Sequence, residues 1–174
     1  MRSIQKLLGL SETAPAGAKD TETVRRIAAE LDRLPRDEAR YIASFAYVLA
    51  RVANADLDVS DEETREMERL VAGMAELGEA QTALVVQIAK HQAVNLGGTE
   101  NYVVTRQFRE LSTHPQRIGL LRCLFAVAAA DESVSHEEEQ QISQIGVELG
   151  LTSPEVASVR GSYRDKLASL KETP

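Results

Sequence analysis

Two short segments of this chain concentrate acidic residues that could bind a metal ion. The first acidic segment, 55–63, reads Ala-Asp-Leu-Asp-Val-Ser-Asp-Glu-Glu, and the second, 130–138, reads Ala-Asp-Glu-Ser-Val-Ser-His-Glu-Glu. Carboxylate and hydroxyl oxygens are the ligands that hard cations such as Ca²⁺ and Mg²⁺ prefer. The candidate metal ligands are the acidic residues Asp56, Asp58, Glu62, Glu63, Asp131, Glu137 and Glu138.

The first acidic segment begins like an EF-hand loop and then departs from it. Asp56, Asp58 and Ser60 occupy loop positions 1, 3 and 5, but position 6 is Asp61 where an EF-hand has Gly, and position 12 is Met67 where it has Glu. The segment is therefore not an EF-hand, and any cation site here must use a different geometry.

Helix capping offers a simpler explanation for some of these acids. Ser60 with Glu63, and Ser135 with Glu138, have the spacing of a capping box. In this motif the Ser oxygen accepts from a free backbone N–H of the first helical turn, and the Glu side chain accepts from the N–H of the cap residue. Capping does not explain Asp56 and Asp131, because each ends the preceding predicted helix, where a negative charge opposes the helix dipole. Both interpretations stay open at this point.

The two acidic segments lie within a longer internal repeat. Residues 49–63 and 124–138 are identical at nine of fifteen positions, with an offset of 75 residues. Two copies are too few for a solenoid, so we expect one domain with two related halves. If a pseudo-two-fold axis relates the halves, the acidic segments either converge on one site or point apart. The sequence does not decide between these arrangements.

The hydrophobic pattern predicts an all-α fold, a compact bundle of about eight helices with an internal two-fold repeat. Apolar residues recur at helical spacing, and no segment alternates long enough for a strand. The helix over about 118–130 is apolar almost all round and should be the most buried element. The last helix should carry apolar positions as far as Leu170. The predicted helices begin near residues 21, 36, 61, 80, 100, 115, 136 and 153.

The chain is expected to divide into an N-terminal segment with a linker, 1–20, and a helical domain, 21–174. Ile4, Leu7 and Leu8 beside two basic residues could dock on a membrane surface or a partner, although a frayed terminus is the simpler interpretation. No run of residues is long and apolar enough to span a membrane, and no secretory signal is visible. We therefore expect a cytoplasmic protein, with peripheral attachment to the inner membrane as an open alternative.

Several classes of function are disfavoured by composition and motif. A net charge of −7 and the absence of Trp argue against a nucleic-acid binder. No nucleophile elbow, phosphate loop or dinucleotide fingerprint occurs, so we expect neither catalysis nor an organic cofactor. The lone Cys123 lies among leucines and should be a buried small hydrophobe. His91, His114 and His136 do not stand at metal-ligand spacing, and His114 is expected in a loop before Pro115.

The pattern Asp-x-x-Val-Ser-x-Glu-Glu after an Ala-rich apolar helix, present twice, resembles the TerB family of tellurite-resistance proteins. The resemblance covers about 36–170. In the family the first Asp is typically followed by Gly, where this chain has Leu57 and Glu132. The resemblance implies a compact helical fold with an acidic, divalent-metal-binding surface. The residues that match the motif are Asp56, Glu62 and Glu63 in one half, and Asp131, Glu137 and Glu138 in the other.

The resemblance also implies a role in tellurite resistance and stress response, through protein partners that include a membrane-bound Ter-type protein. We therefore expect a non-enzymatic domain that binds Ca²⁺ or Mg²⁺ through the two acidic segments. The alternative is a metal-free interaction domain that docks on a basic or membrane-associated partner. A carboxylate-based hydrolase is a third hypothesis, disfavoured because no nucleophile is evident. The partners and the oligomeric state do not follow from the sequence.

Overall fold

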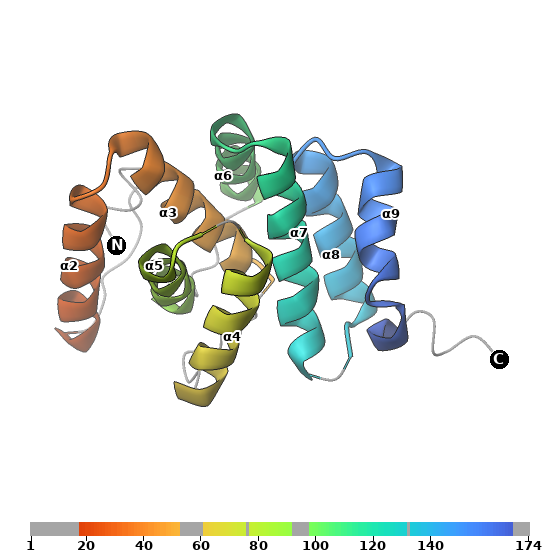
Figure 1. The fold of residues 1–174 in the computed structure, drawn as a ribbon, viewed down its shortest axis with the longest axis horizontal. Coiled ribbons are helices and arrows are strands. Elements are labelled where there is room, and N and C mark those ends of the chain that lie inside the picture. Colours follow the sequence, from red (N-terminus) through yellow and green to blue (C-terminus); the bar gives the residue numbers. More distant parts are fainter. Residues whose placement is uncertain (1–17, 53–60, 76, 92–97, 132, 169–174) are drawn as a thin grey trace.

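The computed structural model describes residues 18–52, 61–75, 77–91, 98–131 and 133–168, apart from the side chains of 18–24, 61–63, 91, 98–100 and 131. Within these ranges the chain forms eight α-helices and two short 3₁₀ helices (Figure 1). The predicted all-α class is confirmed. In chain order the elements are α2 (Ala18–Asp32), α3 (Arg36–Ala50), α4 (Asp61–Met74), α5 (Glu79–His91), α6 (Gly98–Leu111), α7 (His114–Ala128), η1 (Ala129–Asp131), α8 (His136–Glu148), α9 (Ser153–Gly161) and η2 (Arg164–Lys166).

Side-chain caps and one glycine set the helix boundaries in the second half of the chain. Thr113 and Gln116 form a capping box at the start of α7, with Pro115 in its first turn. Helix α8 ends just before Gly150, whose φ of 75° is the left-handed conformation that glycine adopts without strain. The N–H of Leu151 then bonds the carbonyl of Gly146 at 3.1 Å, which closes the helix end.

Two helices form the centre of the molecule. Nine of the fifteen residues of α3 are buried, and eight of the fifteen residues of α7. The stretch 118–130, predicted to be the most buried, has eight of its thirteen residues buried and shares this position with α3, which α5 and α6 cover on its flanks (Figure 1). In α3, Phe45 packs edge-on against Phe108 of α6, with 5.7 Å between ring centroids.

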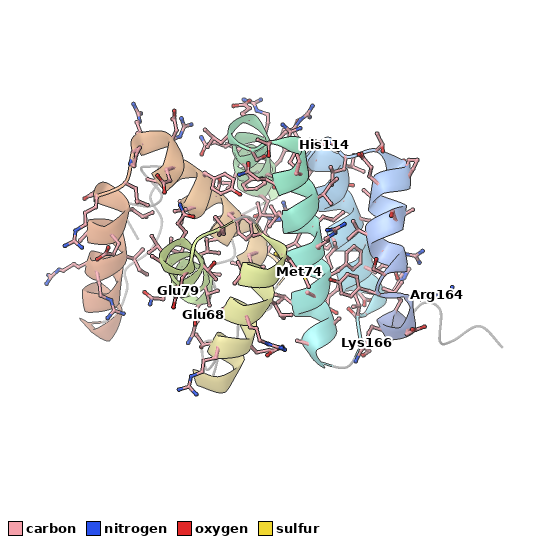
Figure 2. The ribbon with its side chains drawn as sticks, viewed as in Figure 1. Glu68, Met74, Glu79, His114, Arg164 and Lys166 are labelled. Carbon is pink, nitrogen blue, oxygen red and sulfur yellow. The ribbon has the colours of Figure 1, made fainter. Side chains whose placement is uncertain are left out.

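Helices α4 and α7 approach each other closely. A Cβ placed on Gly119 of α7 would lie 2.7 Å from the backbone oxygen of Met74, at the end of α4. Only a residue without a side chain permits this approach. Figure 2 places Met74 where α4 meets α7, so this contact joins the earlier helices to the later ones. The predicted internal repeat itself stays a prediction.

The C-terminal part of the chain differs from the predicted long helix. Helix α9 ends at Gly161, and after η2 the chain makes an isolated parallel bridge between Leu167 and Val134. The N–H of Val134 bonds the carbonyl of Lys166 at 2.9 Å, and the N–H of Ala168 bonds the carbonyl of Val134 at 3.0 Å. Both bridged side chains are fully buried. The bridge buries Leu167 against Val134, and the chain therefore leaves the helical conformation that the apolar pattern predicts.

The remaining boundary differences are small. Helix α2 begins at Ala18, inside the segment predicted as a linker, and His114 is the first residue of α7 rather than part of a loop. Its position follows from the cap at Thr113, which starts the helix one residue before Pro115. Among the described residues, no helix has both the length and the apolar content needed to cross a membrane.

Candidate functional site

The structure describes only part of the predicted metal site. Asp56 and Asp58 lie outside the described residues, as do the side chains of Glu62, Glu63 and Asp131. The backbone of Glu62 and Glu63 is in the first turn of α4, as the capping argument predicts, and Asp131 ends η1. The side chains that the structure places are those of Glu137 and Glu138, both in the first turn of α8.

Glu138 is a helix cap. Its Oε2 accepts hydrogen bonds from the backbone N–H of Ser135 and from the Ser135 hydroxyl, each at 2.8 Å. In return, the N–H of Glu138 donates to Ser135 Oγ at 3.2 Å. The capping-box prediction for this residue is confirmed. Because Oε2 already accepts two hydrogen bonds, Glu138 can offer a cation only its other oxygen without loss of the cap.

The neighbouring acid, Glu139, is held inside the molecule. Its side chain is almost completely buried, and its Oε1 pairs with Nε of Arg160 on α9. Taking a carboxylate out of water is costly unless a cation compensates it, so this pair fixes α9 against the start of α8. Glu139 is therefore a structural group rather than a surface ligand.

Glu137 is exposed and faces an open hollow on α8. The hollow has a volume of about 700 Å³ and is lined by Glu137, Glu139, Gln140, Gln141, Ser143, Gln144 and Val147. Within the described ranges, no group of three or more His, Cys, Asp or Glu side chains comes together as a cation site. The described acids thus have the right ligand chemistry for a hard cation but are too few to hold one alone.

A hydrogen bond connects the chain just before the first acidic segment with the helix that follows the second acidic segment. Nε2 of Gln141, on α8, donates to the backbone oxygen of Arg51 at 2.9 Å. Arg51 directly follows α3 and precedes the first acidic segment by four residues. Gln141 lies one helical turn beyond Glu137 and shares its face of the helix. The end of α3 and the start of α8 are therefore neighbours.

A buried ion pair strengthens this junction. Nη1 of Arg51 donates to Glu148 Oε2 at 2.9 Å and to Thr105 Oγ1 at 2.6 Å. Both ionised side chains are about 10% exposed, so the pair ties the end of α3 to α6 and α8 away from bulk solvent. Sequence reasoning missed Arg51 as a structural residue, since nothing in the local pattern identifies the partner of a single arginine at a helix end.

The residues that the sequence left without a role prove to be structural. His114 Nε2 lies 2.6 Å from Glu155 Oε1, which joins the starts of α7 and α9. Hydrogen bonds from the backbone N–H and hydroxyl of Thr152, and then from His114, lower the pKa of Glu155 to about 2. Burial raises the pKa of the Cys123 thiol to about 12, so it stays protonated and unreactive at neutral pH.

Comparison with known proteins assigns the family. The family model described as "Tellurite resistance protein TerB" matches residues 41–161, from α3 to the end of α9. Neither a curated protein nor a solved structure matches the chain. The matched region includes both acidic segments, the Gln141–Arg51 junction and the ion pairs of α8. The chain belongs to the tellurite resistance protein TerB family.

Proposed function

We propose that this TerB-family domain is a non-enzymatic module that binds one divalent cation, Ca²⁺ or Mg²⁺, between its two acidic segments. The observation that supports convergence is the hydrogen bond from Gln141 to the backbone oxygen of Arg51. Glu137 lies about 6 Å along the α8 axis from Gln141. Covalent geometry limits Asp56 to within about 14 Å of Val52. Acids from both segments are thus within reach of one ion.

The roles of the proposed ligands follow from which carboxylates are already engaged. Glu139 is paired with Arg160, and Glu138 uses Oε2 in its cap. The second segment would then supply Glu137 and Asp131. The first would supply the remaining ligands, Asp56, Asp58, Glu62 and Glu63. Ca²⁺ takes six to eight oxygens in flexible geometry, so this set of carboxylates with water suits it better than the strict octahedron of Mg²⁺.

Calorimetric titration tests cation binding. Ca²⁺, Mg²⁺ and Mn²⁺ are titrated into chelator-treated protein and into the Asp56→Asn/Asp131→Asn variant. We expect saturable binding of Ca²⁺ at micromolar concentrations in the natural chain and none in the variant. The absence of heat from any of the three ions, with identical traces for both proteins, would rule out the cation site.

A second variant tests convergence separately from ligand chemistry. Gln141→Leu removes the donor to Arg51 and no carboxylate, so a site shared by both segments should lose about tenfold in Ca²⁺ affinity. Gln140→Leu is the matched control, because Gln140 bonds His136 on its own helix and should leave the affinity unchanged. Equal affinities in the two variants would indicate two separate sites or none.

Family membership supports a cellular role in tellurite resistance and stress response through assembly with protein partners, including a membrane-bound Ter-type protein. The test is growth on tellurite of a sensitive strain that lacks its own TerB-family protein. The natural chain should restore growth and the Asp56→Asn/Asp131→Asn variant should not. Equal rescue by both would separate the cellular role from cation binding.

The second candidate function is a metal-free docking domain for a basic or membrane-associated partner. The engagement of Glu138 favours it, because the carboxylate oxygen held in the helix cap is one oxygen fewer for a cation. Thermal unfolding discriminates between the two functions. A bound cation raises the melting temperature as its concentration passes the dissociation constant, whereas a docking surface responds to ionic strength alone.

A further inference from the structure

The chain after α9 returns to the second acidic segment. We call residues 163–168 the C-terminal strap, and they lie beyond residue 161, where the family match ends. The strap bonds both backbone polar groups of Val134. The N–H of Val134 donates to the carbonyl of Lys166 at 2.9 Å, and its carbonyl accepts from the N–H of Ala168 at 3.0 Å. The strap therefore holds the backbone in the middle of the second acidic segment.

Two side chains anchor the strap to the rest of the fold. The ring of Tyr163 stacks on Phe125 of α7, with 5.6 Å between ring centroids. Leu167 is fully buried in the bridge. Between these anchors Arg164 and Lys166 of η2 are exposed (Figure 2). The strap is thus docked at both ends and open to solvent in its middle.

The bridge replaces a local contact that the start of α8 lacks. An apolar residue just before an N-cap often packs against the fourth residue of the helix, and this contact fixes the angle at which the chain enters the helix. Val134 directly precedes the cap residue Ser135. The fourth residue of α8, however, is Glu139, which pairs with Arg160. Leu167 supplies the apolar partner instead, so the entry angle of α8 depends on the strap.

This entry angle sets how two of the proposed cation ligands lie relative to each other. Asp131 is three residues before Val134 in the chain, and Glu137 is three residues after it. Ligands that are already in position bind an ion more tightly than ligands that must first be ordered, because ordering reduces the net free energy of binding. Loss of the bridge would let the two carboxylates move independently.

We propose that Leu167 is a positioning residue for the cation site, and that a bound cation in turn holds the strap against Val134. This role rests on the proposed function, since it requires that the second acidic segment binds a cation. Thermodynamic linkage makes the coupling reciprocal. If the docked strap raises the cation affinity by a given factor, the cation raises the equilibrium constant of strap docking by the same factor.

Calorimetric titration of Ca²⁺ into the chelator-treated full chain tests the first half of this coupling. Leu167→Ala should bind Ca²⁺ at least about tenfold more weakly than the natural chain. Leu151→Ala is the matched control, because it removes the same buried side chain at the opposite end of α8 and should change the affinity by less than about twofold. Leu167→Ile keeps the buried volume and should retain the affinity within about threefold. Circular dichroism verifies that each variant folds.

Amide hydrogen exchange in the natural chain tests the reciprocal half. The N–H groups of Val134 and Ala168 form the bridge, so saturating Ca²⁺ should slow their exchange at least about fivefold. The N–H of Leu151, which bonds the carbonyl of Gly146, is the control amide and should change by less than about twofold. Nuclear magnetic resonance measures the three amides separately.

The outcomes separate the role of the strap from the cation site itself. Equal Ca²⁺ affinity in Leu167→Ala and Leu151→Ala would overturn the role of the strap and leave the cation site standing. So would Ca²⁺ binding that leaves the exchange at Ala168 unchanged. A natural chain that binds no Ca²⁺ would overturn the proposed function, and the role of the strap with it, before any variant is titrated. If Leu167→Ala does not fold, amide exchange in the natural chain decides alone.

Discussion

Helices α4 and α8, which follow the two acidic segments, each contact a basic residue of the next helix, but the groups that accept the contact differ. The fourth residue of α4, Thr64, accepts a hydrogen bond from Nζ of Lys90 on α5 at 2.6 Å. The fourth residue of α8, Glu139, forms an ion pair with Arg160 on α9. In each case a basic residue on the next helix reaches the first turns of the helix after the acidic segment. One contact has a neutral acceptor and the other a charged one.

The N-terminal caps of α5 and α9, the helices that come after α4 and α8, differ in the same way. At the start of α5, the N–H of Gly78 donates to the neutral Oε1 of Gln81 at 2.9 Å. At the start of α9, the N–H of Thr152 donates to the carboxylate of Glu155 at 2.8 Å. At these two positions α8 and α9 therefore use carboxylates where α4 and α5 use neutral groups.

Replacing Arg160 and Lys90 one at a time should give the largest difference in the free energy of unfolding. Arg160→Ala removes the guanidinium that pairs with the buried Glu139 and should lower the free energy of unfolding by about 3 kcal/mol. Lys90→Ala removes a single hydrogen bond to a hydroxyl and should cost about 1 kcal/mol. Urea denaturation followed by circular dichroism measures both. Glu139→Ala in the Arg160→Ala background should recover part of the loss, and no recovery would show that the ion pair is not the cause.

The contact between Gly119 of α7 and Met74 of α4 should give the next largest effect on the free energy of unfolding. In Gly119→Ala the added methyl meets the backbone oxygen of Met74, and overpacking of this kind costs about 1–3 kcal/mol. Gly73→Ala is the control on α4 itself, because no atom lies within 4 Å of its added Cβ. There the better helix propensity of alanine should stabilise by up to about 1 kcal/mol. Chemical denaturation of both variants should show opposite signs.

These contrasts separate the features that the sequence predicts, which are local, from contacts between helices, which it does not predict. Local rules sufficed for the helices and for the Ser135–Glu138 cap, because hydrophobic spacing and capping depend on residues near one another in the chain. The sequence does not indicate that Arg51 pairs with Glu148, or that Glu139 faces Arg160, since those contacts depend on how helices pack. The end of α9 was mispredicted for the same reason, because Leu167 turns back to cover Val134.

The difference between Thr64 and Glu139 also predicts an effect on the proposed cation site. Thr64 carries no charge to neutralise Lys90, so the ammonium adds positive potential at the first turn of α4, close in sequence to Glu62 and Glu63. Lys90→Gln should therefore strengthen Ca²⁺ binding about threefold to tenfold at low salt, with the gain reduced in high salt. Calorimetry measures this change. Unchanged or weaker binding would place the cation away from the start of α4.

The smallest expected effect is a pH dependence confined to the charged cap of α9. The folded-state pKa of Glu155 is lowered to about 2, from an ordinary value of 4.5. A carboxylate with a lowered folded pKa stabilises the fold fully above its unfolded pKa, and this contribution is lost as pH falls from about 4.5 towards 2. The natural chain should therefore melt at a higher temperature than Glu155→Gln near pH 6, and the two melting temperatures should converge near pH 2.

Gln81→Glu in the Glu38→Gln background supplies the matched control, because it gives α5 the kind of charged cap that α9 already has. The second substitution is needed because Nε2 of Gln81 donates to Glu38 Oε1 at 2.6 Å, and the pair of changes keeps an amide facing a carboxylate there. If the difference between the caps of α5 and α9 lies in charge alone, this variant should gain the same acid sensitivity over the same pH window. Thermal melts between pH 2 and 7 measure both variants. A Glu155→Gln difference that persists at pH 2 would show that Glu155 acts through packing rather than through its charge.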